Sequence, residues 1–326
     1  MKISNIYVEK GIINHPNTEK IISKVKYKNI ILCNNYSEVF NNNNQNFRIQ
    51  KTNPSLVLAK KNNKFIYEAP KEFSIGFKKN FYFSHMLNCL YDCNYCYLQG
   101  MLNSANFLLF INYEDFFNKI EQIIEKDNDE KCFFSGYDCD SLALENVTNF
   151  VDQLLKHFSI TKNSFFEIRS KSVNIAVLKK NKPQKNFITA LSLNPDFIVK
   201  SYEKNTPSLK KRIATLISLQ NIGWQIGLRF DPLILEGDLN NYKFFFKYVF
   251  KSLDTKLIHS VTLGNFRMPL GYLKKLSKLK PEDKFIQSRN IDRIFSQKNR
   301  FDEEKFLEFC LNEIHKYIDI KKVFLN

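Results

Sequence analysis

The sequence predicts an α/β fold in which a mostly parallel sheet forms an open or partial barrel. Strand-like segments recur mostly about every 25–40 residues, with amphipathic segments between them, which is typical of consecutive βαβ units. Six candidate strands are too few for a closed eight-stranded barrel. The strand candidates are residues 80–85, 131–136, 164–169, 188–194, 224–231 and 259–264, and the helix candidates lie near 113–127, 141–158, 207–221 and 239–253.

Each candidate strand after the first ends in polar or small residues. In a parallel sheet the carboxyl ends of the strands meet at one edge, where ligands bind. We therefore expect these residues to line one shared site. They are Ser135-Gly136, Ser170-Lys171-Ser172, Ser192-Leu193-Asn194, Arg229-Phe230-Asp231 and Thr262-Leu263-Gly264.

The chain contains no repeat and no Pro-rich or Gly/Ser-rich linker. We expect an N-terminal region over residues 1–79 that packs on the barrel, a barrel over 80–265 and a basic region over 266–326. The helix near 207–221 follows Asn205-Thr206-Pro207-Ser208, which indicates a helix cap with proline in the first turn.

The composition is that of a globular protein. With 31 Phe and 15 Tyr in 326 residues, the chain can bury enough apolar surface to exclude disorder as its main state. No run of 18 apolar residues predicts a membrane-spanning helix, and the first residues lack the apolar core of a leader peptide. We expect a cytoplasmic protein with no membrane partner.

The net charge of +16 favours a polyanionic partner such as nucleic acid. An alternative is compositional drift, because only eight of the 49 basic residues are Arg and the chain is rich in Lys, Asn and Ile. Clustering favours the first interpretation: residues 251–300 contain twelve Lys or Arg but only four Asp or Glu.

Three of the seven cysteines form one group directly after the first candidate strand. Cys89, Cys93 and Cys96 are spaced C-x3-C-x2-C, and thiolates are ligands for zinc or iron–sulfur clusters. A structural zinc site needs a fourth ligand, which His85 could supply. Three thiolates on a four-iron cluster would instead leave one iron open to bind a substrate.

The spacing C-x3-C-x-aromatic-C resembles that of radical S-adenosylmethionine (SAM) enzymes. Within that superfamily, NCLYDCNYCYLQG at residues 88–100 is similar to the cluster segment of the spore photoproduct lyase family, as are IYVEKGIINHP, RSKSVNI, SLNP and LGNFRM in the same order. The resemblance covers residues from about 6 to 268. It implies a (β/α)6 partial barrel, a 4Fe-4S cluster and SAM as cofactors, and cleavage of SAM to a 5′-deoxyadenosyl radical. The radical would reverse 5-thyminyl-5,6-dihydrothymine, a UV-induced thymine dimer in DNA.

The resemblance also implies roles for individual residues. Cys89, Cys93 and Cys96 would bind the cluster, and the aromatic Tyr95 would pack near the adenine. Lys171 would meet the SAM carboxylate or ribose. The remaining SAM-pocket positions are Ser135 and Gly136 near the amino group, with Ser192 and Asn194 on the next strand.

The lyase reaction also needs a hydrogen donor, which in this family is a cysteine assisted by tyrosines. Cys139 is close to the expected separation from the cluster cysteines, and Tyr95 and Tyr97 match the assisting tyrosines. If the chain is instead aligned with the family on residues 140–145, the donor position falls at Tyr137. The sequence leaves this choice open.

DNA and a reductant such as flavodoxin or ferredoxin are the expected partners. The C-terminal region carries Arg289, Arg293, Lys298 and Arg300 but no copy of the family's basic hairpin, so lesion specificity stays open. One alternative is a radical SAM enzyme acting on another nucleic-acid or small-molecule substrate. Another is a non-enzymatic nucleic-acid-binding protein in which His85 and the cysteines hold zinc.

Overall fold

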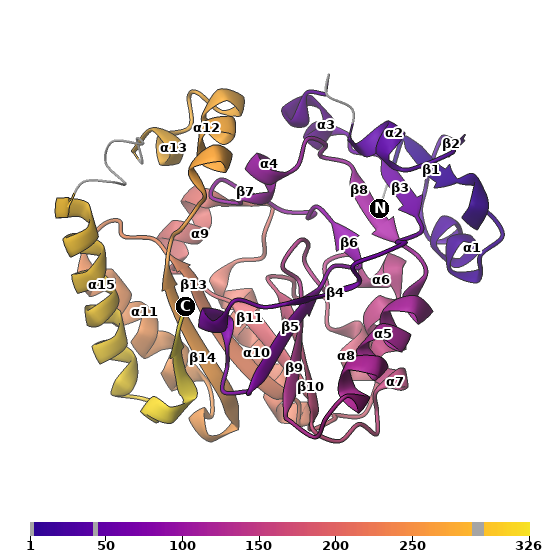
Figure 1. Ribbon diagram of the computed structural model, residues 1–326. Helices are drawn as coiled ribbons and strands as arrows, with labels where there is room; N and C mark the ends of the chain where they lie inside the picture. Colours follow the sequence, from indigo (N-terminus) through magenta and orange to yellow (C-terminus); the bar gives the residue numbers. More distant parts are fainter. Residues whose placement is uncertain (1–2, 42–44, 289–296) are drawn as a thin grey trace.

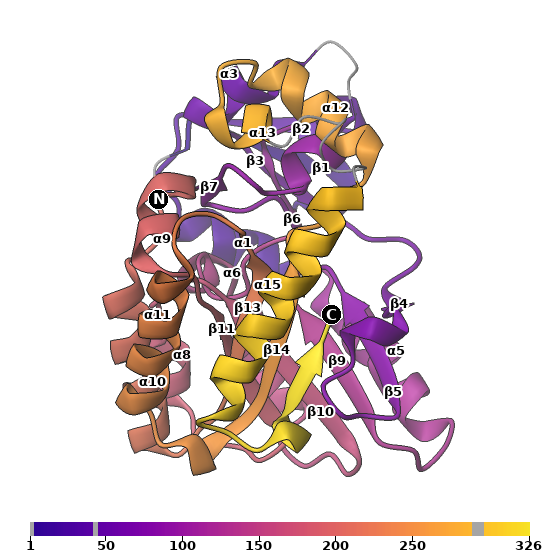
Figure 2. The same cartoon turned by 90° about the vertical axis from the view of Figure 1, so that its left-hand side faces the viewer.

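The six predicted strands are confirmed, and they lie side by side in one sheet that curls into a half-barrel (Figures 1 and 2). The computed structural model describes residues 3–41, 45–288 and 297–326. The sheet has the order β15-β14-β13-β11-β10-β9-β5-β4 and is parallel except for β4. Its strands are β4 Ile66–Glu68, β5 Lys79–Phe83, β9 Lys131–Ser135, β10 Ser164–Ser170, β11 Phe187–Ser192, β13 Gln225–Leu233, β14 Ile258–Asn265 and β15 Val323–Leu325.

A second sheet lies beside the open half of the barrel (Figure 1). Its short strands were not predicted from the sequence. A four-residue apolar run such as that of β8 (Phe107–Phe110) does not distinguish a strand from a helix. Residue 80 does not separate the strands of the two sheets. The strand β4, which precedes it, joins the barrel sheet, and β6 and β8, which follow it, join the second sheet. Its order is β2 Asn29–Cys33, β1 Asn5–Glu9, β3 Leu56–Ala59, β8 Phe107–Phe110 and β6 Met86–Leu87.

Helices lie on the outer face of the half-barrel, with α10 packed on β13 and α15 on β14. In the described part of the chain, no helix is both long and apolar enough to cross a membrane. The principal helices are α5 Tyr113–Glu125, α7 Phe150–His157, α8 Ala176–Lys180, α9 Asp196–Tyr202, α10 Leu209–Ile222, α11 Leu239–Ser252, α12 Leu270–Leu279, α13 Lys284–Ser288 and α15 Gln297–His315.

Two helices differ from the prediction at their ends. The segment 141–158 forms the short α6 (Glu145–Thr148) and then α7, separated by Asn149 at φ 52°, a left-handed conformation that Asn tolerates. The carboxylate of Glu145 accepts hydrogen bonds from the first amides of α7. In α10 the cap is Ser208, whose hydroxyl accepts from the Lys211 amide, so Pro207 precedes the cap instead of occupying the first turn.

The cysteine loop is fixed over the carboxyl edge of the sheet by a buried ion pair. The two-residue strand β7 (Asp92–Cys93) pairs antiparallel with β12 (Glu203–Lys204), which places Glu203 opposite Cys93. The Glu203 carboxylate accepts hydrogen bonds from Tyr95 and from Arg212 of α10. Arg212 is fully buried and also donates to the Ser192 carbonyl at 2.9 Å.

Because this ion pair is fully buried, removal of one partner should be costly. We expect Arg212→Met to lower the free energy of unfolding by about 3–5 kcal/mol, since it leaves the Glu203 carboxylate buried without its cation. Urea denaturation measures the change. The control is Lys210→Met, an exposed neighbour on the same helix, which should cause little change. Equal stabilities of the two variants would contradict this account.

Candidate active site

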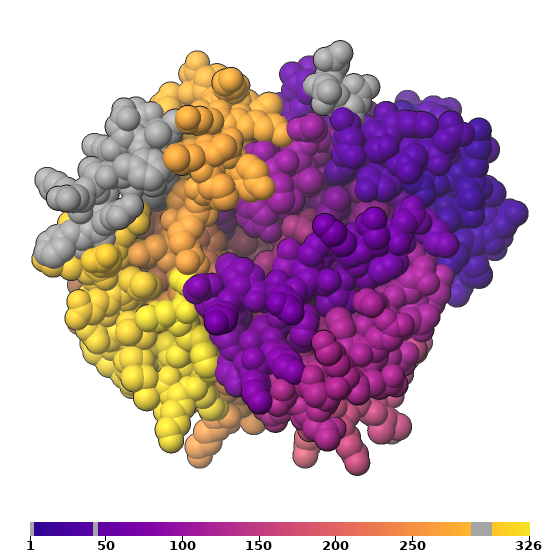
Figure 3. Space-filling model, viewed as in Figure 1, coloured from indigo at the N-terminus to yellow at the C-terminus, as the bar shows by residue number. Residues whose placement is uncertain are grey.

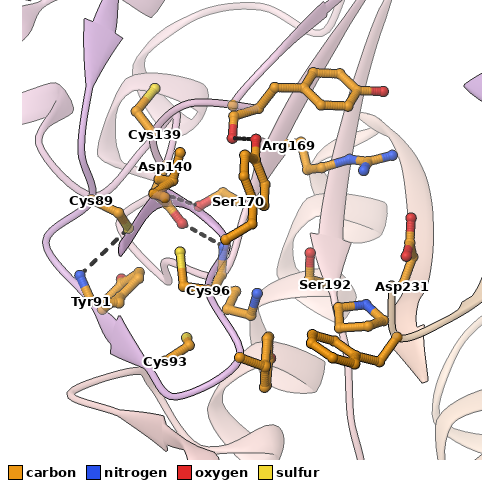
Figure 4. A pocket seen from close by; sticks show the side chains of 18 of the residues that line it. Cys89, Tyr91, Cys93, Cys96, Cys139, Asp140, Arg169, Ser170, Ser192 and Asp231 are labelled. Atoms are coloured by element: carbon orange, nitrogen blue, oxygen red, sulfur yellow. Dashed lines mark hydrogen bonds between the residues drawn. The ribbon is translucent and has the colours of Figure 1, made fainter. Parts of the chain in front are cut away.

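The three clustered cysteines and five strand ends line one cavity of about 320 Å³ at the carboxyl edge of the sheet (Figure 4). Cys89, Cys93 and Cys96 form one wall. The prediction that the polar strand ends share a site is confirmed for β9, β10, β11 and β13, whereas β14 contributes Asn265, one residue beyond the predicted Thr262-Leu263-Gly264. Their lining residues are Gly136, Arg169, Ser170, Lys171, Ser192, Asp231 and Asn265.

The surface is hollowed on the face seen in Figure 3, between the orange segment that follows β14 and the purple segment that precedes β5. Phe73, at the end of the short 3-10 helix Lys71–Phe73, lines the cavity from the purple segment, and Phe266 and Arg267 line it from the orange one. Arg267 is exposed, so the cavity is reached past an aromatic residue and a cation.

Burial controls the charge of the three thiols. It raises the pKa of Cys89 to about 12 and also raises the pKa of Cys93 and Cys96. Such thiols stay protonated at neutral pH unless a positively charged group binds them as thiolates, as a metal centre does. The donor set therefore fits an iron–sulfur cluster: three soft ligands on one loop, next to a cavity that leaves room for a further ligand.

His85 does not complete a zinc site with the cysteines. It is buried and stacks on Phe150 with 3.9 Å between ring centroids, in the hydrophobic core. Within the described ranges, no three His, Cys, Asp or Glu side chains are grouped to hold a metal ion. A four-iron cluster spaces its thiolates more widely than a single ion does, because each thiolate binds a different iron. The zinc alternative has no support in this arrangement.

The structure divides the predicted SAM residues into two sets. Gly136, Lys171 and Ser192 line the cavity. Ser135 instead lies behind it, where its hydroxyl contacts that of Ser141 at 2.7 Å and donates to the Glu167 carbonyl. Asn194 also lies behind the cavity wall, and its amide donates to Glu203 at 3.1 Å.

Lys171 brings a positive charge to the cysteine end of the cavity. Its ammonium lies 5.5 Å from the centroid of the Tyr95 ring. Burial alone would lower the pKa of Lys171, but the neighbouring Cys93 and Glu203 raise it above its ordinary value. A protonated lysine at this place favours an anionic group of a ligand.

Asp140, which sequence analysis did not select, fixes the end of β10 against the loop after β9. Its carboxylate accepts from the Ser170 hydroxyl at 2.6 Å and from the Lys171 amide at 2.7 Å. At the start of the same loop, Gly136 has φ +85°, and a Cβ there would lie 2.5 Å from the Arg169 carbonyl. The loop therefore depends on a glycine at one end and a carboxylate at the other.

Both candidate hydrogen-donor positions line the cavity. Cys139 is buried, and Figure 4 shows its sulfur pointing away from those of the three clustered cysteines. The hydroxyl of Tyr137 has no hydrogen-bond partner among the residues that the structure describes. Tyr97 donates its hydroxyl proton to the Tyr137 carbonyl at 2.6 Å, whereas the Tyr95 hydroxyl is bonded to Glu203.

Two further polar residues of the cavity, Arg169 and Asp231, received no predicted role. Asp231 belongs to the predicted end of its strand, whereas Arg169 is the last residue of the candidate strand 164–169. The strand-end pattern places both at the carboxyl edge, but it does not distinguish a cavity residue from a core residue. Arg229, two residues before Asp231, is fully buried and bonds to Glu167. Among the predicted basic residues of the C-terminal region, Arg289 and Arg293 lie outside the described residues.

Comparisons with known proteins agree on one family. The family sequence profile for spore photoproduct lyase matches residues 2–276. The spore photoproduct lyase of Bacillus subtilis is 22% identical over 268 residues, covering 79% of this chain and 75% of that protein. That of Clostridium acetobutylicum is 25% identical over 171 residues, covering 52% of this chain and 50% of that one.

Solved structures show the same fold. A spore photoproduct lyase variant with bound AdoMet and dinucleoside spore photoproduct has a TM-score of 0.79 at 14% identity, covering 99% of this chain and 98% of that chain. Another spore photoproduct lyase, complexed with dinucleoside spore photoproduct, has a TM-score of 0.78 with the same identity and coverage. The predicted radical SAM partial barrel is confirmed, and the chain belongs to the spore photoproduct lyase family of enzymes.

Proposed function

We propose that this protein is a radical SAM lyase that reverses the spore thymine dimer, 5-thyminyl-5,6-dihydrothymine, in DNA. The observation that carries the proposal is the cavity in which Cys89, Cys93 and Cys96 face Lys171 at the carboxyl edge of a partial barrel. The family membership supports both the cofactors and the substrate. A lesion in duplex DNA would have to leave the base stack to reach the cavity.

Cys89, Cys93 and Cys96 would hold a 4Fe-4S cluster. When bound and reduced by a donor such as flavodoxin or ferredoxin, the cluster supplies the electron that cleaves SAM to a 5′-deoxyadenosyl radical. Lys171 would bind the SAM carboxylate or ribose, and Ser192 would add a hydrogen bond from the next strand. Ser135 and Asn194 would act from behind the wall, by holding Ser141 and Glu203 in place.

Cys139 would return a hydrogen atom to the thymine-derived radical, with Tyr97 assisting it. Support comes from its place in the cavity and from the Tyr97 hydroxyl, which lies at the adjacent Tyr137 carbonyl. Tyr95 would serve mainly as a packing surface, because its hydroxyl is already bonded to Glu203. Tyr137 is the competing donor, since its buried hydroxyl lines the same cavity.

One anaerobic reaction tests the function. Cluster-loaded protein with SAM, dithionite and DNA carrying the dimer should yield 5′-deoxyadenosine and restored thymine, both measured by liquid chromatography. Cys96→Ala should bind little iron and give neither product, whereas Cys33→Ala, outside the cavity, should give both. Deoxyadenosine without restored thymine would keep the radical chemistry and reject this substrate, in favour of another nucleic-acid or small-molecule substrate.

The hydrogen donor can be identified in the same assay. Cys139→Ala should leave deoxyadenosine formation intact but lower thymine recovery by about a hundredfold or more, the lower range for loss of a proton-transferring group. Tyr137→Phe is the matched comparison, because it removes only a hydroxyl from the same cavity. If Tyr137→Phe loses thymine recovery and Cys139→Ala does not, the donor is Tyr137.

The proposed role of Lys171 predicts a defect in SAM binding. Lys171→Met keeps the length of the side chain but removes the charge, so the Kd for SAM should rise about tenfold, which corresponds to about 1.4 kcal/mol. Equilibrium dialysis of cluster-loaded protein with labelled SAM measures it. Lys179→Met, at the exterior of α8, is the control. An unchanged Kd for Lys171→Met would remove this residue from the SAM site.

A further inference from the structure

Away from the cysteines, the cavity contains a cation and an anion that the proposed reaction does not use. Arg169, from β10, and Asp231, from β13, both line it. In Figure 4 their side chains extend toward the same space, on the side opposite Cys89 and Cys93. Lys171, two residues after Arg169 at the end of the same strand, is at the cysteine side. The two ends of the cavity therefore differ in chemistry.

Arg169 is held so that its terminal nitrogens face the cavity. Its Nε donates to Glu167 at 2.9 Å, and its guanidinium lies 5.2 Å from the centroid of the Tyr137 ring. Glu167 is itself fixed, because it is fully buried and accepts from Arg229 at 2.7 Å. With Nε engaged and the guanidinium anchored on two sides, the remaining donors are the two Nη nitrogens, in a direction set by the protein.

Asp231 is held as an acceptor beside it. Its Oδ2 accepts from the side-chain amide of Asn326 at 3.1 Å. Its other oxygen, Oδ1, lies beside Gly264. A larger residue at position 264 would crowd this oxygen, because a Cβ there would lie 3.1 Å from it. Arg169 and Asp231 thus present a fixed donor and a fixed acceptor to the same space, next to the aromatic rings of Tyr137 and Phe73.

We propose that Arg169 and Asp231 recognise the imide edge of a thymine-derived base. That edge carries an N3–H between two carbonyl oxygens. Asp231 would accept from N3–H and Arg169 would donate to an adjacent carbonyl oxygen, while the aromatic rings contact the flat base. This inference rests on the proposed function, and it names the residues that select the substrate. A site built to bond an N–H strongly disfavours an analogue that lacks it, because the buried acceptor is left unpaired.

Binding of two matched ligands tests this assignment. The first is the dinucleoside spore photoproduct, and the second is the same compound methylated at N3 of both bases, which removes the donor and keeps the carbonyls. We expect cluster-loaded wild-type protein to bind the unmodified compound at least about tenfold more tightly, as measured by isothermal titration calorimetry. Asp231→Ala, which removes the acceptor, should reduce that preference to about threefold or less. Arg169→Met should weaken binding of both compounds, because both retain the carbonyl oxygens.

The control is Asp196→Ala, a partly exposed residue of α9 that pairs with Lys200, which should keep the wild-type preference. SAM affinity and thermal unfolding identify a variant that has misfolded, and the wild-type comparison of the two ligands needs no variant at all.

If wild-type protein restores thymine but binds both compounds equally, the proposed recognition of the imide edge is wrong and the lyase function stands. A preference that persists in Asp231→Ala would also reject the assignment. Deoxyadenosine without thymine, and no binding of either compound, would reject the lyase function and this inference with it.

Discussion

The site depends on one buried carboxylate, that of Glu203. The loop that carries the three cysteines has little regular structure: the strand β7 contains only two residues, and its partner β12 contains Glu203 itself. Glu203 bonds to Tyr95, in the middle of the loop, and to Arg212 on α10. A carboxylate so deeply buried is tolerated only with its cation in place. The helix α10 thereby fixes a loop that the sheet alone could not, and a cluster-binding loop must be held to within a fraction of an ångström.

The same burial gives the cavity its charge balance. Without a metal centre the cysteine thiols are neutral, because desolvation raises their pKa, and the charges that line that end are then those of Lys171 and Asp140. Binding of a metal centre would deprotonate the thiols, and their negative charge would favour a protonated Lys171 further. At the opposite end, Arg169 and Arg229 share the Glu167 carboxylate, and Asp231 supplies a second negative charge, so the terminal nitrogens of Arg169 can lie at the cavity without an anionic ligand. One end is thus suited to a charged cofactor and the other to a neutral polar group.

The barrel strands could be predicted because each is an apolar run that ends in polar residues, and a parallel sheet collects those ends at one edge. The second sheet could not, since β6 and β8 are short and pair with strands distant in sequence. For the site, the cysteine spacing predicts three thiols close together, and all three line the cavity with Lys171. The position of Asn194 behind Tyr95 was not predictable, because strand periodicity gives the end of a strand but not which end residue reaches the cavity.

The loop from Gly136 to Asp140 explains why sequence left the hydrogen donor ambiguous. Gly136 fits against the Arg169 carbonyl at one end, and Asp140 bonds Ser170 and Lys171 at the other, so the three residues between have fixed end points. Residues 137–139 form a bend between these end points, not an extended strand. Tyr137 and Cys139 both line the cavity. A donor displaced by two residues remains within the same cavity, and a long tyrosine side chain can cover a distance that a cysteine cannot. In the proposed reaction, the register of this loop, more than the identity of either residue, would decide which group meets the substrate radical.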